Sequence, residues 1–314
     1  MLDVRRLRVL REVAARGTIA AAADVLHLTP PAVSQHLTKL EQEAGVKLLV
    51  KHGRSVRLTE AAQLLVAHSE RILAQLEACE ADLAAQQGIY GAELRIAAFP
   101  TAIRVIAPQV IRALAQELPT AVRLTESEPE HALTLLRAGD LDLAIAHEYD
   151  RVPRRMAAGT ERIPLFDEPM LIALADDHPQ ARPGMGLSSL AEEPGWIVPS
   201  PPGITCREQV MRICAEAGFS PLVSSETYSY DATLALVGAG AIAIVPELAV
   251  PLAPANVRFF SPCDVMARRS VFAAVRQGSS RRPDIAIAIQ ALKAAAEAHV
   301  NDVSVTPLVA RVAG

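Results

Sequence analysis

Two short helical patterns joined by a tight turn constrain the fold of this chain more than any other segment. Residues 18–45 read TIAAAADVLHLTPPAVSQHLTKLEQEAG. Thr18 is placed to cap a first helix, and Thr29 is placed to cap a second. Pro30 takes the first position of the second helix, where its missing N–H costs nothing, and Gly45 suits a left-handed exit. The segment therefore predicts a helix, a turn and a second helix.

The second of these helices has two different faces. Val33, Leu37 and Leu40 recur at helical spacing and are expected to face a core. The opposite stripe is polar and short-armed and consists of Ser34, Gln35, Thr38 and Lys39. Such a face fits the major groove of DNA, but a helix face that merely meets solvent would look similar. The stripe alone leaves both interpretations open.

The flanking segments favour DNA. Upstream, apolar residues at helical spacing predict a first helix that closes a three-helix core; they are Val4, Leu7, Leu10 and Val13. Downstream, VKLLVKHGRSVRLT predicts two short strands around a turn at Gly53, which form a wing. Lys51, His52 and Arg54 lie at its tip, and Arg57 points outward from the return strand, where they can meet phosphates.

The charge of the chain is divided unevenly. Residues 1–60 hold ten Lys and Arg against six Asp and Glu, a net charge of +4, whereas the whole chain of 314 residues has a net charge of −4. The remainder is therefore at −8. A basic head on an acidic body indicates that nucleic acid is bound at one end only.

With these features, residues 1 to about 90 resemble the winged helix-turn-helix and linker helix of the LysR-type transcriptional regulators. The rest of the chain resembles the effector-binding domain of that family. The matching segments are LRVLREVAARGTIAAAADVLHLTPPAVSQHLTKLEQEAGVKLL, HGRSVRLTEAA, GDLDLAI and LVGAGAIAIVP. The resemblance implies a sequence-specific regulator that binds double-stranded DNA as a dimer of dimers and responds to a small-molecule effector, with no cofactor.

On this interpretation, two groups of side chains contact DNA. Pro30, Pro31, Ser34, Gln35, Thr38 and Lys39 are expected in or against the major groove. Gln35 is the best candidate for reading a base, because its amide can bond an adenine edge in two places. The phosphate contacts are expected from Thr18, Lys51, Arg54 and Arg57.

A long helix is predicted after the wing. Thr59 can cap it, and Gly88 ends it after about Gln87. Residues spaced alternately four and three apart form a mostly apolar seam along a rod of roughly 40–45 Å. The seam consists of Leu58, Ala62, Leu65, Ser69, Ile72, Leu76, Cys79, Leu83 and Gln86. Pairing with a second copy through Leu65, Ile72, Leu76 and Leu83 would bury it, and folding back onto its own body is the alternative.

From Glu93 onward, short apolar runs rich in β-branched residues alternate with amphipathic stretches at 103–117, 129–138, 205–217, 229–238 and 283–299. This pattern predicts an α/β body with mostly parallel sheets. The resemblance implies a periplasmic-binding-protein-like body of two subdomains, joined by crossover strands near 162–167 and 264–271. The expected divisions are a head at 1–58, a linker helix at 59–88, and an effector domain at 92–300. Within that domain, subdomain I spans 92–163 and 270–300 and subdomain II spans 168–264; the tail 301–314 is a candidate for disorder.

The effector site is expected where strands end and helices begin. In AAFPTAI, Thr101 can offer a hydroxyl and an amide to a ligand, with Pro100 and Ala102 beside it, although Thr101 also suits a helix cap. The opposite lip is expected from SPPGIT, with Ser200, Pro202, Gly203 and Thr205, and His147 ends a strand facing the same cleft in the family. Glu126 and Glu128 would repel an anion there and favour a ligand that carries an amine.

Two cysteines raise a different possibility. CREQVMRICAEAG is similar to the segment that carries the redox pair in peroxide-sensing members of the family, with a spacing one residue shorter. On a helix, Cys206 and Cys214 would lie roughly 12 Å apart, whereas a disulfide needs Cα atoms within about 7 Å. A thiol-based redox sensor is therefore the alternative function, and buried cysteine as a small apolar side chain is the structural alternative.

Catalysis and membrane insertion are not expected. Neither a Gly-rich phosphate loop nor a GxSxG elbow occurs, and the cysteines show no spacing typical of a metal site. An enzyme fused to a winged helix and an architectural DNA binder remain remote alternatives. The chain has no run of roughly 20 apolar residues and no signal peptide pattern, so a cytoplasmic location is expected.

Overall fold

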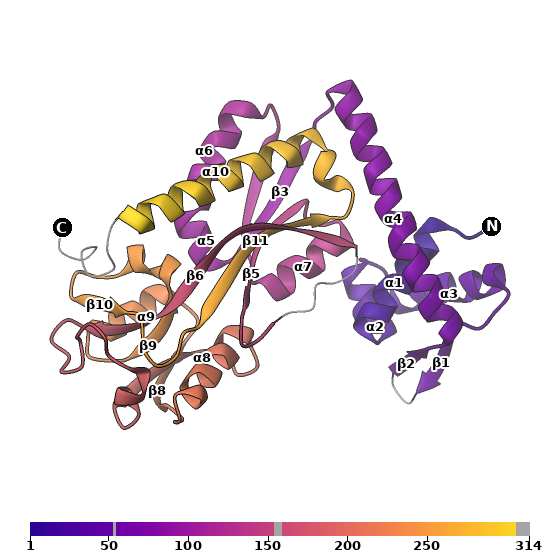
Figure 1. The fold of residues 1–314 in the computed structure, drawn as a ribbon. Helices are drawn as coiled ribbons and strands as arrows, with labels where there is room; N and C mark the ends of the chain where they lie inside the picture. Colours follow the sequence, from indigo (N-terminus) through magenta and orange to yellow (C-terminus); the bar gives the residue numbers. More distant parts are fainter. Residues whose placement is uncertain (53–54, 154–158, 306–314) are drawn as a thin grey trace.

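The computed structural model describes residues 1–52, 55–153 and 159–305 (Figure 1). The head contains the helices α1 (Val4–Arg16), α2 (Ile19–Val25) and α3 (Pro30–Ala44), followed by the strands β1 (Leu49–His52) and β2 (Ser55–Leu58). The hydroxyls of Thr18 and Thr29 accept hydrogen bonds from backbone amides as N-caps of α2 and α3, and Gly45 ends α3 at φ 69°. These predicted caps are confirmed.

The core of the head is the predicted one with a single exception. The side chains of Leu7, Leu10, Val33 and Leu40 are buried together. Val4 was expected on the same face, but it is 38% exposed at the first position of α1, where it borders an open surface hollow that Val25 and His36 also line. Gly53 and Arg54, at the tip of the predicted wing, lie outside the described residues, as do the side chains of Lys51 and His52.

The helix α4 (Glu60–Gln87) begins at the N-cap Thr59 and ends at Gly88, as predicted. Its two faces have different neighbours. Leu73 and Ala81 are buried on the side that packs against the turn around η3 (Ser279–Arg281), where a Cβ added at Gly278 would collide with the carbonyl of Ala74. Only the later part of the predicted seam is open, with Ile72 and Leu76 each 40% exposed and Leu83 51% exposed. Earlier in the seam, Ala62 and Ser69 are completely buried, and Leu65 packs against the core of the head. The seam is therefore available for pairing from Ile72 onward.

The body contains one seven-stranded sheet in the order β10-β6-β11-β5-β3-β4, with β9 also paired to β6, and a small sheet of β7 and β8. The strands are β3 (Glu93–Ala98), β4 (Ala121–Glu126), β5 (Leu143–Tyr149), β6 (Thr160–Ala175), β7 (Pro194–Pro199), β8 (Leu222–Thr227), β9 (Ala243–Pro246), β10 (Val257–Phe260) and β11 (Arg268–Arg276). The expectation of mostly parallel sheets is wrong, because β11 runs antiparallel to both β5 and β6, and β6 also runs antiparallel to β9 and β10.

Two long strands connect the halves of the body. The first part of β6, up to Pro169, pairs with β11, and the last part, from Met170, pairs with β9 and β10. The expected crossover at 162–167 falls inside β6, whereas only 268–271 of the expected crossover at 264–271 belongs to a strand. The two long strands are therefore common to both halves of the body.

Helices cover both faces of the first half. The elements are α5 (Pro100–Val105), α6 (Ala107–Glu117), α7 (Pro129–Ala138) and α10 (Pro283–Val305). The predicted helix 103–117 is split, because Pro108 lies in the first turn of α6 and forces a new start. The side chains of α6 and α10 form one apolar core with the sheet, and those of α7 form another on the opposite face.

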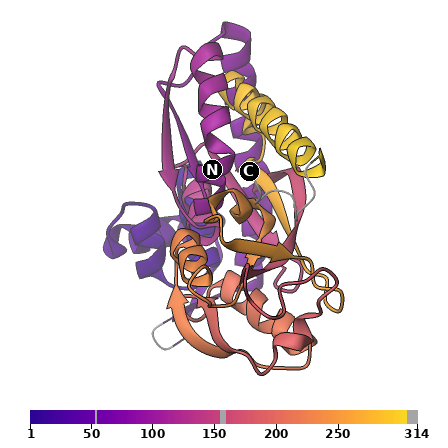
Figure 2. The same ribbon diagram turned by 90° about the vertical axis from the view of Figure 1, so that its left-hand side faces the viewer.

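The second half carries α8 (Thr205–Glu216) and α9 (Tyr230–Val237) with the short helices η1 (Leu187–Leu190) and η2 (Glu247–Leu252). Figure 2 shows these orange elements at the opposite end of the body from the yellow α10. Residues 301–305 extend α10, so the beginning of the expected disordered tail is helical, and 306–314 lie outside the described part of the chain. Among the helices described, none is both long and apolar enough to span a membrane.

Candidate functional site

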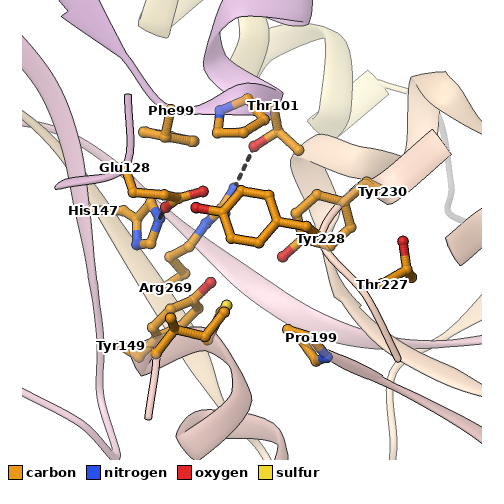
Figure 3. A pocket seen from close by; sticks show the side chains of 13 residues that line it. Phe99, Thr101, Glu128, His147, Tyr149, Pro199, Thr227, Tyr228, Tyr230 and Arg269 are labelled. Carbon is orange, nitrogen blue, oxygen red and sulfur yellow. Dashed lines mark hydrogen bonds and ion pairs between the residues drawn. The ribbon is translucent and has the colours of Figure 1, made fainter. Parts of the chain in front are cut away.

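A small cavity lies between the two halves of the body, at the ends of β3 and β5 (Figure 3). It is lined by Phe99, Pro100, Thr101, Glu128, His147, Tyr149, Pro199, Ile204, Cys206, Thr227, Tyr228, Tyr230 and Arg269. The centre of a water-sized molecule can occupy about 30 Å³ of it. Since one water needs roughly 10–15 Å³ on this measure, the cavity fits about two waters. A larger ligand would require the two halves to move apart.

Arg269 provides the buried cation of this cavity, with 1% of its surface exposed. Its guanidinium lies 2.6 Å from the carboxylate of Glu168, donates a 3.2 Å hydrogen bond to the Thr101 hydroxyl, and stacks over the Phe99 ring at 4.9 Å. Burial alone would lower the pKa of Arg269, but the carboxylate of Glu168 outweighs this effect and raises it. The charge of Arg269 is therefore already neutralised by a neighbour.

Glu128 provides the carboxylate that faces into the cavity. It lies 3.9 Å from Nε2 of His147, and its side chain is 29% exposed. Burial raises the pKa of Glu128 to about 7, and the neighbouring carboxylate of Glu130 adds to the rise, while Arg269 and a hydrogen bond with Tyr228 oppose it. Near neutral pH, Glu128 is therefore present in both protonation states.

Tyrosine hydroxyls line the rest of the wall. Burial raises the pKa of Tyr149 and that of Tyr230, and the two side chains hydrogen-bond to each other. Burial and the charge of Glu128 raise the pKa of Tyr228 to about 12. These phenols stay protonated at neutral pH, so they can present hydroxyl donors to a ligand.

Cys206 and Cys214 both belong to α8 and carry free thiols. Cys206 lines the cavity, whereas Cys214 is completely buried two turns further along the helix. Burial raises the pKa of each thiol to about 12, and the charge of Glu128 contributes at Cys206. Both thiols are thus protonated and weakly nucleophilic, and a disulfide between them requires α8 to unwind.

The structure brings together only some of the residues expected to bind an effector. Pro100, Thr101 and His147 line the cavity. Ala102, in contrast, is completely buried in the apolar core. Thr101 is the second residue of α5 rather than its cap, because Phe99 takes the N-cap position.

The expected second lip lies further out. Ser200, Pro202 and Gly203 are not among the lining residues, because the loop that holds them turns away toward the end of β8, where the Ser200 hydroxyl is 3.4 Å from Glu226. The hydroxyl of Thr205 donates a 2.9 Å hydrogen bond to Glu130 on the other half. Thr205 therefore joins the two rims of the cleft outside the cavity.

The sequence analysis missed Arg269, the tyrosines and Phe99. The sequence pattern could have indicated Arg269. It stands two and four residues before Val271 and Ala273, and this spacing puts all three on one face of β11, which is buried. A charged residue on a buried strand face needs a partner and is a candidate for a site. The tyrosines gave no such signal, because they come from separate segments, at the end of β5, the start of α9 and the loop before it, which meet only in the folded chain.

The head presents the predicted polar stripe of α3 to solvent. Pro30, Pro31, Ser34, Gln35, Thr38 and Lys39 are all exposed. The hydroxyls of Ser34 and Thr38 donate to carbonyls one turn earlier in their own helix. Arg57 is exposed on β2, and Thr18 is half-buried in its capping role.

Comparison with known proteins identifies the family. Residues 4–63 match the family described as "Bacterial regulatory helix-turn-helix protein, lysR family", and residues 87–297 match "LysR substrate binding domain". The chain is 32% identical over 310 residues to the "DNA-binding transcriptional dual regulator OxyR" of Escherichia coli K12, covering 96% of this chain and 98% of that protein.

Solved structures share the fold. A full-length OxyR variant of Pseudomonas aeruginosa matches with a TM-score of 0.58 at 24% identity, over 93% of this chain and 95% of the other. A Corynebacterium glutamicum OxyR mutant described as H2O2-bound matches with a TM-score of 0.57 at 25% identity, over 100% and 95% of the two chains. The two family matches and the extended identity to a curated relative show that this chain belongs to the LysR family of transcriptional regulators.

Proposed function

We propose that this chain is a sequence-specific DNA-binding regulator controlled by a small molecule that binds between the two subdomains of its body. The observation that carries the proposal is the cavity around Arg269 and Glu128, which both subdomains line. Two polar contacts span the cleft beside it, from Thr205 to Glu130 at 2.9 Å and from Arg104 to Asp231 at 2.6 Å. A ligand that widens or narrows the cleft would alter both contacts and so change the relative position of the two subdomains.

The charges of the cavity indicate the class of ligand. Because Glu168 neutralises Arg269, the acidic group that faces the space is the carboxyl group of Glu128, which is only partly ionised near neutral pH and which a bound amine would favour in its charged form. A dianion would meet this carboxylate with Glu126 and Glu130 nearby. A small polar ligand with an amine or another hydrogen-bond donor opposite Glu128 fits better, and hydroxyls from Thr101 and Tyr228 are available to it.

A thermal-shift screen of the purified protein tests the proposal. The compounds are amino acids, small amines, organic acids, aromatic acids and nucleobases. We expect an amine-containing compound to raise the melting temperature of the wild type and to have a much smaller effect on Glu128→Gln and Thr101→Val. Glu226→Gln serves as a matched control for the loss of one carboxylate outside the cavity. If only dianionic compounds stabilise the protein, the proposed ligand class is wrong.

A second candidate is a thiol-based sensor. Two observations favour it: Cys206 lines the cavity, and a similar protein of Corynebacterium glutamicum is described as H2O2-bound. The protonated state of both thiols and their placement on one intact helix argue against it in this conformation. Melting curves with hydrogen peroxide and with reductant separate the two. An oxidation shift that is lost in Cys206→Ser would favour the sensor.

The oligomer and the DNA surface complete the proposal. We infer that the exposed seam residues of α4, which are Ile72, Leu76 and Leu83, pair with a second copy and that dimers associate further into tetramers. Leu65, also predicted for this contact, is partly buried against the core of the head. The polar stripe of α3 then enters the major groove, while Thr18, Arg57 and the wing residues Lys51 and Arg54 meet phosphates. We infer a cytoplasmic location from the proposed binding to DNA, and we assign no catalytic residue.

A further inference from the structure

The helix α7 lies between the effector cleft and the DNA-binding head (Figure 1). Ala132, Leu133 and Leu136 bury its inner face against β5 and β11, where they share an apolar cluster with Phe272. Ten residues of helix span about 15 Å. A helix packed in this way is expected to move as a rigid body with the sheet. A displacement of its N-terminal end would then also displace its C-terminal end.

The N-terminal end of α7 contacts the second subdomain. Glu128 takes its N-cap position and hydrogen-bonds to Tyr228, which precedes α9. In the first turn of α7, Glu130 accepts the 2.9 Å hydrogen bond from Thr205, the first residue of α8. Both partners come from the far side of the cleft. A change in the distance between the two subdomains would therefore act directly on the first turn of α7.

The C-terminal end of α7 contacts the head and the linker helix. The guanidinium of Arg137 lies 3.9 Å from the carboxylate of Glu12 on α1 and 3.8 Å from that of Glu70 on α4. The carbonyl of Arg137 accepts a 2.9 Å hydrogen bond from Arg11. One helix end therefore meets two elements of the DNA-binding half.

This contact is buried and charged, which distinguishes it from an incidental surface contact. The Glu12 side chain has 0% of its surface exposed, and the side chains of Arg137 and Glu70 have 10% and 12%. A buried carboxylate is costly unless a cation faces it, and Arg137 of the body supplies one of the cations that surround Glu12, beside Arg11 and Arg16 of its own helix. The position of the head is consequently specified by the body.

We propose that α7 transmits the separation of the two effector subdomains to the DNA-binding head, through Thr205 and Glu130 at one end and Arg137 with Glu12 and Glu70 at the other. The inference rests on the proposed function, in which a ligand changes that separation. Arg137 acts as a positioning residue: it touches neither the ligand cavity nor the predicted DNA surface, yet it sets how the head is held.

Hydrogen exchange of the full-length protein, read by mass spectrometry without any ligand, tests this. The variants are Thr205→Val, which removes the cross-cleft hydrogen bond and leaves α7 unchanged, Arg137→Gln, and the double variant. Arg112→Gln is the matched control, because Arg112 is exposed on α6, which covers the opposite face of the sheet. Circular dichroism confirms folding, and Glu70→Gln replaces Arg137→Gln if that variant does not fold.

We expect Thr205→Val to speed exchange of the α1 and α2 amides by about fivefold, the lower end of common coupling strengths. Arg137→Gln should do the same or more, and the double variant should add nothing to it. Faster exchange confined to α7 and α8 in Thr205→Val, or additive effects in the double variant, would overturn the inference. If the thermal-shift screen finds no ligand, that outcome counts against the proposed effector. It does not affect the hydrogen-exchange result, which is measured without ligand.

Discussion

The ion pair of Glu168 and Arg269 makes a sharp prediction about stability. Each side chain is 1% exposed, and the Glu168 carboxylate also accepts a 2.6 Å hydrogen bond from the amide of Leu248. Replacing Glu168 with alanine leaves a buried guanidinium without its carboxylate and an amide without its acceptor. Breaking a buried pair from one side costs about 3–5 kcal/mol.

The prediction is measured as the free energy of unfolding in urea, followed by the fluorescence of Trp196, which is buried in the core of the second subdomain. Glu168→Ala should lose about 3–5 kcal/mol, whereas the double variant Glu168→Ala with Arg269→Met should recover part of the loss, because the unpaired charge is gone. The control is Glu216→Gln, which breaks an exposed pair with Arg151 at 3.0 Å and should cost less than about 1 kcal/mol. The reasoning would be refuted if Glu168→Ala and Glu216→Gln lost equally small free energies of unfolding. It would also be refuted if the double variant were less stable than the separate losses of Glu168→Ala and Arg269→Met add up to.

Three further predictions concern the cleft, the seam and the head. The pKa of Glu128 is raised from 4.5 to about 7, so its ionisation lowers folding stability once the pH exceeds 4.5, with the full loss above about 7. Glu128→Gln should therefore melt at a higher temperature than the wild type at pH 8 and at the same temperature at pH 4. A gain in melting temperature that is independent of pH would contradict this. Leu76→Asp on the seam should give a smaller species in analytical ultracentrifugation, whereas Leu64→Asp, 63% exposed off the seam, should not. On duplexes selected by the wild type, Gln35→Ala should relax the preference at one base pair at a cost of about 1–3 kcal/mol, whereas Arg57→Ala should weaken all duplexes alike and reduce the salt slope by about 1.

The sequence was most informative where structure depends on near neighbours. Thr18, Thr29 and Thr59 cap the helices that they were predicted to cap, because a cap needs only a hydroxyl and an amide three residues away. The core positions of α3 follow from its periodicity in the same way.

Features that depend on distant segments were missed. Arg269 meets Thr101 across 168 positions of the chain, and Ala102 is buried in the core that α5 forms with the sheet and α10. The contact between Arg137 and Glu12 joins two domains whose patterns are each ordinary. Local periodicity contains no information on which of two buried charges will be adjacent.

The strand order of the body determines when it can be completed during synthesis. β11 lies between β5 and β6, although it follows both of them in sequence. Until about residue 276 has left the ribosome, β5 and β6 each expose an edge that β11 will later pair. The head needs only the first 60 or so residues and can fold long before that. A nascent chain therefore holds a folded DNA-binding unit beside an unfinished sheet, and the second subdomain, encoded between the two halves of the first, is made before the first can close.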